Sequence, residues 1–345
     1  MKTIHVQASK SYDVVIGSNL LNKLGEHLYG LLNRICKVAI ISDSNVYPLY
    51  GELAETSLKR RGYEAIHYVF PAGEASKNPA TYLSILNFLA ENHLTRTDII
   101  VALGGGVTGD MSGFAASTYL RGIPYVQIPT TLLAMVDSSV GGKTAIDLPV
   151  GKNLVGAFYQ PSLVLCDLDA LNTLPQQVFC DGCAEVIKYG VLYDADLFNH
   201  LAEYGLDFDR EDVISRCVEW KRNVVAQDEF DTGARAKLNL GHTIGHGVEA
   251  LSNFSVSHGQ AVAIGMAIVS KAGCKDIYDS LTKVIKQFHL PTTTEFTANQ
   301  LYTCALSDKK RAGGTVNLII PNTIGDCSIV PIPVDNLESF IEEGL

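Results

Sequence analysis

Hydrophobic and polar positions follow two different periods in the first half of the chain, and these periods predict strands and helices in turn. Short runs rich in β-branched residues predict strands at 37–43, 64–70, 98–106, 124–131 and 162–167. Between them, residues 46–62 and 78–94 have apolar positions at helical spacing, and Asn78 followed by Pro79 is typical of a helix start. This alternation predicts a Rossmann-like domain, a parallel α/β sheet covered by helices.

After about residue 174 the apolar positions recur at helical spacing instead. The segments with this spacing are 175–194, 210–229, 241–251 and 257–273, and only 316–330 resembles a short hairpin. We therefore expect an α/β domain over 1–174 and a mainly α-helical domain over 175–345, with the boundary near Thr173–Pro175. The N-terminal residues 1–15 alternate apolar and polar positions, which predicts a first strand and not a signal peptide.

Composition narrows the class of protein. Acidic residues outnumber basic ones by 37 to 27, a formal charge of −10, which argues against nucleic-acid or membrane-surface partners. Without an apolar run of about 18 residues we expect no membrane span and a cytoplasmic location. Most of the eight cysteines lie in apolar runs as expected for reduced thiols, and the lone Cys180–Cys183 motif is a weak signal for zinc or redox chemistry.

Three glycines, residues 104–106, end the strand predicted at 98–106 and come directly before a helical pattern. Glycines at such a turn let the backbone approach a phosphate, and the helix N-terminus offers unpaired N–H groups to its charge. The spacing G-G-G-x-x-G-D differs from the common dinucleotide fingerprint. The turn favours a nucleotide ligand, although a tight strand-to-helix turn would use the same residues.

A divalent metal site is indicated by histidines with a nearby carboxylate. His242 and His246 lie four residues apart on one helix face, and a capping box of Ser257 and Gln260 places His258 in the first turn of the next helix. Asp181, Glu185 and Lys188 share a face that also bears apolar residues. Two histidines with one carboxylate are typical of a catalytic site, with the His242–His246 pair as the first candidate. A structural histidine pair remains the alternative.

Several cations lie where a solvated surface does not require them. Lys221 and Asp228 fall on the apolar stripe of 210–229, and a snorkelling lysine is the alternative interpretation. Other basic and amide residues lie beside glycine turns or the histidine motif: Lys143, Lys152, Asn153, Arg235, Asn239 and the basic run 308–311. These residues predict a small anionic ligand with phosphate or carboxylate groups.

Four segments in order give the chain a resemblance to the dehydroquinate synthase family. They are PTTLLAMVDSSVGGKTAIDLPVGKNLVGAFYQP at 129–161, CAEVIKYG at 183–190, LNLGHTIGH at 238–246 and VSHG at 256–259. The resemblance covers nearly the whole chain. It implies a two-domain enzyme with bound NAD, one Zn²⁺ or Co²⁺ ion and a homodimeric assembly.

The resemblance also implies a role for particular residues. The metal ligands would be Glu185, His242 and His258, so that His246 faces substrate and the helical pair is not the ligand pair. NAD would contact Asp43, Glu74, Lys77, Gly105, Gly106, Asp110, Thr130, Thr131 and Thr173, with Lys143 and Lys152 between cofactor and substrate. Substrate would contact Lys143, Lys152, Asn153, Lys188, Lys221, Arg235, Asn239, His246 and either Lys309 or Lys310. Arg121 would reach the partner subunit's phosphate site, Asp137 would support proton transfer, and Asp231 replaces the glutamate of many relatives.

The implied reaction converts 3-deoxy-D-arabino-heptulosonate 7-phosphate into 3-dehydroquinate and phosphate, with NAD regenerated. A metal-dependent polyol dehydrogenase is one alternative, disfavoured by the intact 141–145 and 151–156 blocks. A related sugar-phosphate cyclase is a second, and Lys221 with Arg235, as a carboxylate-binding pair, favours the heptulosonate. A non-catalytic nucleotide-binding regulator is a third, disfavoured because the matched positions are all filled.

Overall fold

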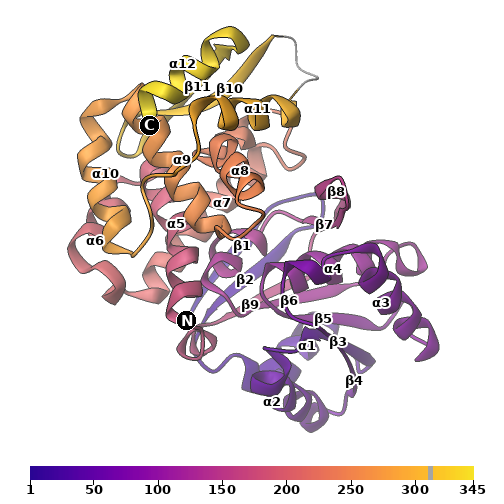
Figure 1. Cartoon of the computed structure of the whole chain (residues 1–345). Helices are drawn as coiled ribbons and strands as arrows, with labels where there is room; N and C mark the ends of the chain where they lie inside the picture. Colours follow the sequence, from indigo (N-terminus) through magenta and orange to yellow (C-terminus); the bar gives the residue numbers. More distant parts are fainter. Residues whose placement is uncertain (310–313) are drawn as a thin grey trace. The chain divides into compact units, whose positions relative to one another are not determined.

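The computed structural model describes residues 1–309 and 314–345, which form two compact units (Figure 1). Unit 1 comprises Met1–Pro175 and Lys221–Phe230, and unit 2 comprises Gln176–Trp220 and Asp231–Leu345. The segment 221–230 therefore groups with the α/β residues, although it continues a helix of unit 2. No helix in the described part of the chain has the length and apolar character needed to cross a bilayer.

A seven-stranded sheet forms the centre of unit 1, in the order β1-β2-β9-β6-β5-β3-β4. The strands are β1 Lys2–Val6, β2 Tyr12–Gly17, β3 Lys37–Asp43, β4 Glu64–Phe70, β5 Ile99–Gly104, β6 Tyr125–Pro129 and β9 Leu163–Asp167. All neighbours pair in parallel except β1 and β2. The predicted parallel sheet is confirmed. The prediction of a single N-terminal strand is wrong, because residues 7–11, which are polar except for Ala8, turn the chain into an antiparallel hairpin.

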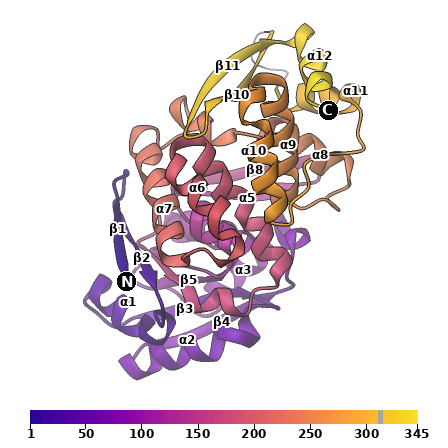
Figure 2. The ribbon, with the colours of Figure 1, turned by 90° about the vertical axis from the view of Figure 1, so that its left-hand side faces the viewer.

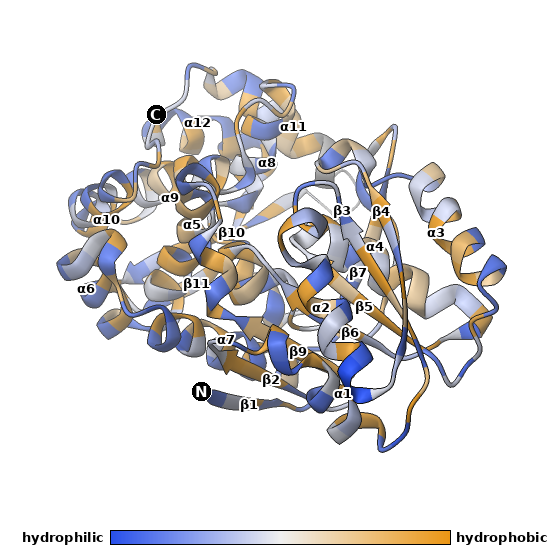
Figure 3. Ribbon diagram, turned by 90° about the horizontal axis from the view of Figure 1, so that it is seen from below, coloured by the Kyte–Doolittle hydropathy of each residue, from blue (hydrophilic) through white to orange (hydrophobic). Residues whose placement is uncertain are grey.

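Helices cover both faces of this sheet, because successive strand residues point to opposite sides. Val38 and Ile40 of β3 belong to the apolar cluster under α1 Leu24–Leu32 and α2 Tyr47–Arg61. Ala39 and Ile41 belong to the cluster under α3 Pro79–Glu91 and α4 Gly106–Thr118. The central strands are buried on both sides, and Figure 3 shows their hydrophobic colouring. This explains why they read as continuous apolar runs and not as alternating ones.

The predicted start of α3 is confirmed in detail. The Asn78 side chain accepts a hydrogen bond from the backbone N–H of Thr81 at 3.0 Å, and Pro79 occupies the first helical position. Such a cap stabilises a helix by about 1 kcal/mol because it satisfies an otherwise unpaired N–H group.

A second hairpin in unit 1 was not predicted. It pairs β7 Lys143–Leu148 with β8 Gly151–Phe158, and its two strands are antiparallel. Just before it, Ala134–Ser138 form a single π-helical turn, a departure from regular helix that is frequent at functional sites. The conspicuous motif at 129–161 therefore folds as a turn and a hairpin added to the sheet domain.

Unit 2 is mainly helical, as expected, and α9 His258–Gly273 lies at its centre. This helix packs against four others, α5, α8, α10 and α12, which are seen in Figure 2. The helices around it are α5 Gln176–Tyr193, α6 Ala195–Tyr204, α7 Arg210–Gln227, α8 His242–Leu251, α10 Lys275–Gln287, α11 Ala298–Lys309 and α12 Val334–Gly344. The predicted hairpin is confirmed as β10 Thr315–Thr323 and β11 Asp326–Pro333, and the terminal helix after it was not predicted.

The junction of α5 and α6 is held by one carboxylate. Asp194 caps α6 through the backbone N–H of Leu197 at 3.0 Å, and it accepts hydrogen bonds from Arg216 Nε at 2.9 Å and Trp220 Nε1 at 3.1 Å. The Trp220 ring stacks on Tyr193, with centroids 5.3 Å apart. Burial would raise the pKa of Asp194, but hydrogen bonds from Arg216, Leu197 and Trp220 outweigh it and lower the pKa.

Candidate metal centre and cofactor-binding edge

Helix α5 turns two opposite charges into the core of unit 2. Glu185 and Lys188 are each only 1% exposed, and Lys188 Nζ forms an ion pair with Glu185 Oε2. The helix face that these two residues share with apolar side chains therefore points inward. Buried charges require partners or a metal ion, so a pair placed here marks a functional position more than a stabilising one.

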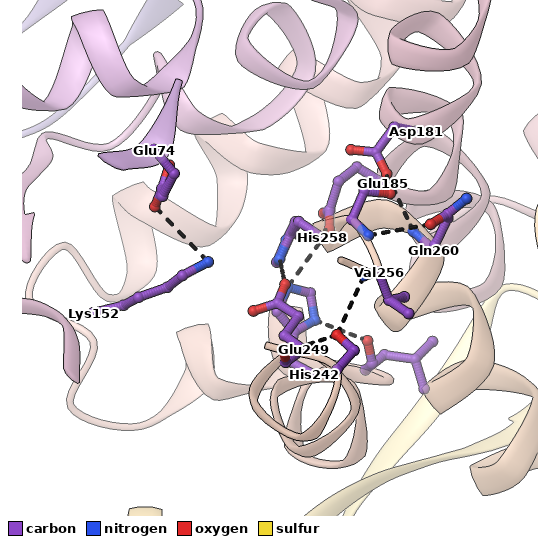
Figure 4. Close-up of polar contacts among 12 residues, drawn as sticks. Glu74, Lys152, Asp181, Glu185, His242, Glu249, Val256, His258 and Gln260 are labelled. Carbon is purple, nitrogen blue, oxygen red and sulfur yellow. Dashed lines mark hydrogen bonds and ion pairs between the residues drawn. The ribbon is translucent and has the colours of Figure 1, made fainter. Parts of the chain in front are cut away.

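Two histidines approach the other oxygen of Glu185. Nε2 of His242, at the start of α8, and Nε2 of His258, at the start of α9, each lie 3.5 Å from Glu185 Oε1 (Figure 4). One donor atom from each of these three residues lies within 4.8 Å of the other two. Three separate helices therefore place two imidazole nitrogens and one carboxylate oxygen around a common point.

The second nitrogen of each ring has a hydrogen-bond acceptor as its partner: a backbone carbonyl oxygen in one case and a carboxylate oxygen in the other. Nδ1 of His242 lies 3.0 Å from the backbone carbonyl oxygen of Leu240, and Nδ1 of His258 lies 2.7 Å from Glu249 Oε1. Each Nδ1 must therefore bear the hydrogen. In the neutral form of each ring the lone pair is therefore on Nε2, which faces Glu185.

The two rings differ in their affinity for protons. Burial and the charge of Lys188 lower the pKa of His242 to about 3. Burial alone would also lower the pKa of His258, but its hydrogen bonds to Glu185 and Glu249 outweigh that effect and raise the pKa to about 10. A metal ion that binds both rings must displace the proton from His258, so its binding is coupled to proton release.

The donor set fits a catalytic zinc or cobalt ion. Two histidines and one carboxylate leave coordination positions for water or substrate, and nitrogen with oxygen donors suits both metals. His246 lies one turn beyond His242, with ring centroids 5.6 Å apart, and it is not in the described three-donor group. The histidine pair at i and i+4 is thus not the pair that converges on Glu185.

The Cys180–Cys183 motif is not part of this cluster. All eight cysteines are free, and burial raises the pKa of the Cys180 and Cys183 thiols. Protonated, buried thiols are poor metal ligands and poor nucleophiles. The expectation of reduced cysteines is confirmed.

In unit 1 the residues predicted for NAD follow successive strands of the parallel sheet. Asp43 ends β3, Glu74 and Lys77 follow β4, Gly105 and Gly106 follow β5, Thr130 and Thr131 follow β6, and Thr173 follows β9. Because the strands are parallel, these residues gather at one edge of the sheet. The order reverses between β3 and β5, the point where such sheets bind ligands.

Contacts between loops hold this edge together. Thr108 Oγ1 lies 3.3 Å from Asp43 Oδ2, and the Thr130 N–H donates to the carbonyl oxygen of Gly104 at 3.0 Å. Tyr50 Oη and Thr173 Oγ1 lie 2.5 Å apart. A small cavity of about 60 Å³ opens beside Tyr50, Thr130 and Ala170. The edge is thus preorganised by its own hydrogen bonds.

Lys77 links this edge to the β7–β8 hairpin. It is 5% exposed, and its Nζ lies 2.6 Å from both Asp110 Oδ2 of α4 and Asn153 Oδ1 of β8. Asn153 has a left-handed backbone, φ 56°, and its N–H donates to Asp147 Oδ1 at 2.7 Å. Burial would lower the pKa of Lys77, but the charges of Asp110 and Glu74 outweigh it and raise the pKa. A predicted NAD contact thereby touches a predicted substrate contact.

The remaining predicted residues of unit 1 have varied surroundings. Lys221 is 6% exposed, with Nζ 2.6 Å from Asp137 Oδ1 in the π-helical turn, so it does not snorkel to solvent. Lys152 Nζ lies 3.8 Å from Glu74 Oε1 (Figure 4). Lys143 begins β7 with an exposed side chain. Arg121 is an exposed residue in a left-handed conformation, φ 68°.

Arg235 and Asn239 lie in unit 2, in the 3₁₀ segment Ala234–Asn239, where Arg235 is 2% exposed and Asn239 is exposed. Lys221 belongs to unit 1, so the carboxylate-binding pair of Lys221 and Arg235 stays a prediction. Lys310 lies outside the described residues, and Lys309 is described only as the backbone end of α11. The choice between these two lysines also stays a prediction.

Two family models together match most of the chain. The model for the 3-dehydroquinate synthase N-terminal region matches residues 67–181, and the model for its C-terminal region matches 182–311. A 3-dehydroquinate synthase from Clostridium acetobutylicum is 44% identical over 342 residues, covering 95% of this chain and 96% of that protein. One from Pelobacter propionicus is 45% identical over 343 residues, covering 95% of each.

Solved structures agree with the fold. A 2-epi-5-epi-valiolone synthase from Streptomyces hygroscopicus with NAD⁺ and Zn²⁺ bound has a TM-score of 0.88 at 28% identity, covering 98% of each chain. A 2-deoxy-scyllo-inosose synthase complexed with carbaglucose-6-phosphate, NAD⁺ and Co²⁺ has a TM-score of 0.89 at 23% identity, covering all of each chain. A glycerol dehydrogenase from Schizosaccharomyces pombe has a TM-score of 0.68 at 17% identity, covering 99% of this chain and 90% of that one.

Proposed function

The chain belongs to the 3-dehydroquinate synthase family, and from this premise we propose how its residues divide the conversion of 3-deoxy-D-arabino-heptulosonate 7-phosphate into 3-dehydroquinate and phosphate. The activity is that of a carbon–oxygen lyase acting on phosphate, in the shikimate pathway to the aromatic amino acids. The observation that carries the proposal is the convergence of two imidazole nitrogens and one carboxylate oxygen in unit 2.

Glu185, His242 and His258 would hold one zinc or cobalt ion, and the carboxyl edge of the sheet would hold NAD. Related enzymes whose structures contain NAD⁺ with Zn²⁺ or Co²⁺ support both assignments. When bound, NAD supplies a reversible hydride acceptor and the metal ion a Lewis acid for the substrate oxygens. The edge residues proposed for NAD are Asp43, Glu74, Lys77, Gly105, Gly106, Asp110, Thr130, Thr131, Lys143, Lys152 and Thr173.

The cations and amides would hold the substrate's carboxylate, phosphate and hydroxyl groups. The residues proposed are Lys143, Lys152, Asn153, Lys188, Lys221, Arg235, Asn239, His246 and one of Lys309 and Lys310. Lysine and arginine bind such anions through charge-assisted hydrogen bonds, which favours them for this task. Asp137 would move a proton, and Lys221 holds its carboxylate in place at 2.6 Å. Orientation by these groups supplies part of the rate enhancement.

The test is phosphate release from 3-deoxy-D-arabino-heptulosonate 7-phosphate with catalytic NAD and zinc or cobalt, followed together with absorbance at the NADH band. We expect stoichiometric phosphate without accumulation of NADH, abolished by a chelator and restored by added metal. Steady NADH production from a polyol, with no phosphate released, would instead favour the dehydrogenase alternative, whose fold is related.

We also propose a cytoplasmic homodimer in which Arg121 reaches the phosphate site of the partner subunit. Arg121 is exposed and has a left-handed backbone, which supports a role in contact with a second subunit. Sedimentation of the purified enzyme tests the assembly. An Arg121→Ala variant can also be mixed with a variant that is inactive at another site. Restored activity in the mixture would support the proposal that each subunit supplies Arg121 to the site of its partner.

A further inference from the structure

Two of the three helices that supply the proposed metal ligands also supply a carboxylate to the third. We propose that Glu249 is a positioning residue that fixes the His258 ring with Nε2 toward the metal, and that Asp181 fixes the turn from which this ring projects. This inference rests on the proposed function, because it concerns how the metal site is assembled. Neither carboxylate was singled out in this role from the sequence.

Glu249 acts from helix α8, seven residues after His242. That separation is about two turns, so both side chains lie on the same helix face. Glu249 is 4% exposed, and its Oε1 lies 2.7 Å from Nδ1 of His258 (Figure 4). A carboxylate accepts hydrogen bonds but donates none when ionised, so it selects the form of His258 with hydrogen on Nδ1.

Asp181 acts from helix α5, one turn before Glu185. Its carboxylate accepts hydrogen bonds from the Ser257 hydroxyl and, at 3.2 Å, from the Gln260 backbone N–H. Gln260 Oε1 in turn accepts from the Ser257 N–H at 3.1 Å. Asp181 is thus a third member of the predicted capping box. The three hydrogen bonds among Asp181, Ser257 and Gln260 hold the chain on both sides of His258.

The pattern places one ligand and one supporting carboxylate on each of two helices. Helix α5 has Glu185 and Asp181, helix α8 has His242 and Glu249, and both supporting groups act on the start of α9 (Figure 4). An imidazole can present either nitrogen, and a wrong ring orientation would present an N–H group to the ion. Holding the ring orientation, so that Nε2 and not Nδ1 faces the ion, raises the affinity of the site, an effect typical of outer-shell carboxylates.

The experiment compares zinc affinity in the full-length protein without substrate, by competition with a chromogenic chelator, for Glu249→Leu and Glu249→Gln. Asp194→Asn is the matched control, because Asp194 is another largely buried, hydrogen-bonded carboxylate of unit 2 that holds no proposed ligand. We expect the zinc dissociation constant to rise by about 10- to 100-fold in Glu249→Leu and by less in Glu249→Gln, whose carbonyl oxygen still accepts a hydrogen bond.

In Asp194→Asn the melting temperature should fall while the zinc dissociation constant stays unchanged. The visible spectrum of the cobalt-loaded protein should change in the Glu249 variants and not in the control. Parent-like zinc affinity and cobalt spectra in a folded Glu249→Leu protein would overturn the proposal, and Glu249→Gln decides it if the leucine variant does not fold. A parent protein that binds zinc tightly but releases no phosphate would refute the proposed function and leave this measurement valid.

Discussion

Each unit buries a lysine–carboxylate pair, and the two pairs have different surroundings. In unit 1, Lys77 joins Asp110 and the amide of Asn153, so cation, anion and amide satisfy one another. In unit 2, Lys188 joins one oxygen of Glu185, while two imidazole nitrogens approach the other oxygen. The first pair is a clamp between structural elements, and the second is one side of the proposed metal site. The burial and pairing of a lysine and a carboxylate therefore do not by themselves show whether the pair has a structural or a functional role.

The largest effect is expected when the carboxylate of each pair becomes an amide. Glu185→Gln should weaken zinc binding by more than about 100-fold, since losing a charged ligand lowers metal affinity more than losing a residue that only supports a ligand. In the metal-free protein it should cost about 3–5 kcal/mol, because Lys188 loses its buried partner. Asp110→Asn should cost about 1–3 kcal/mol, because Lys77 keeps Asn153, and it should leave zinc affinity unchanged. Urea unfolding and chelator competition measure both variants, and equal effects on zinc would remove the distinction.

A smaller effect is expected when the lysine of the clamp is replaced. Lys77→Met leaves Asp110 and Asn153 without their shared donor, so we expect a loss of about 1–3 kcal/mol in stability. If the clamp aligns the cofactor edge with the hairpin, NAD affinity should also fall, and fluorescence titration with NADH would show this. Asn153→Ala should weaken NAD binding less, because it leaves the pair of Lys77 and Asp110 intact. Unchanged NAD affinity in both variants would show that the clamp contributes to stability and not to NAD binding.

Asp194 allows the stability contributions of the two buried pairs to be compared with that of a less buried pair, because its partner Arg216 is partly exposed. Its pKa is lowered in the folded protein, so its contribution to stability is present above the unfolded value of about 4 and is lost as the pH falls through the folded value. Asp194→Asn should therefore cost about 2 kcal/mol at pH 7 and less as the pH falls below about 4. Urea unfolding at several pH values checks this, and a difference that does not change with pH would show that the charge of Asp194 contributes nothing.

The regular part of the fold could be predicted from periodicity, and the irregular part could not. The strands at 37–43 and 64–70 and the cap at Asn78 follow from local patterns, and all are present. The β7–β8 hairpin was not predicted, because its glycines and exposed residues do not alternate between apolar and polar positions. Leu154, for example, is apolar but 57% exposed. The two N-terminal strands merged into one prediction because both alternate, and only the turn between them separates them.

The candidate site was predictable in its residue types but not in its assembly. The His242–His246 spacing indicated a shared face, yet the ring that joins His242 at Glu185 comes from another helix, which no local period reveals. Glu249 could have been found, since it continues the His242–His246 face by one further turn. The contact of Lys221 with Asp137 had no sequence signal, because the two residues lie 84 positions apart and no local period connects them.

The single tryptophan of the chain is also the last residue of unit 2 before the chain enters unit 1. Its indole is held by Tyr193 and Asp194, so its emission reports the surroundings of one known point in the molecule. The protein thus has a built-in optical probe that needs no label. Time-resolved emission and quenching can follow the middle of helix α7 during unfolding or ligand addition, separately from the fifteen tyrosines.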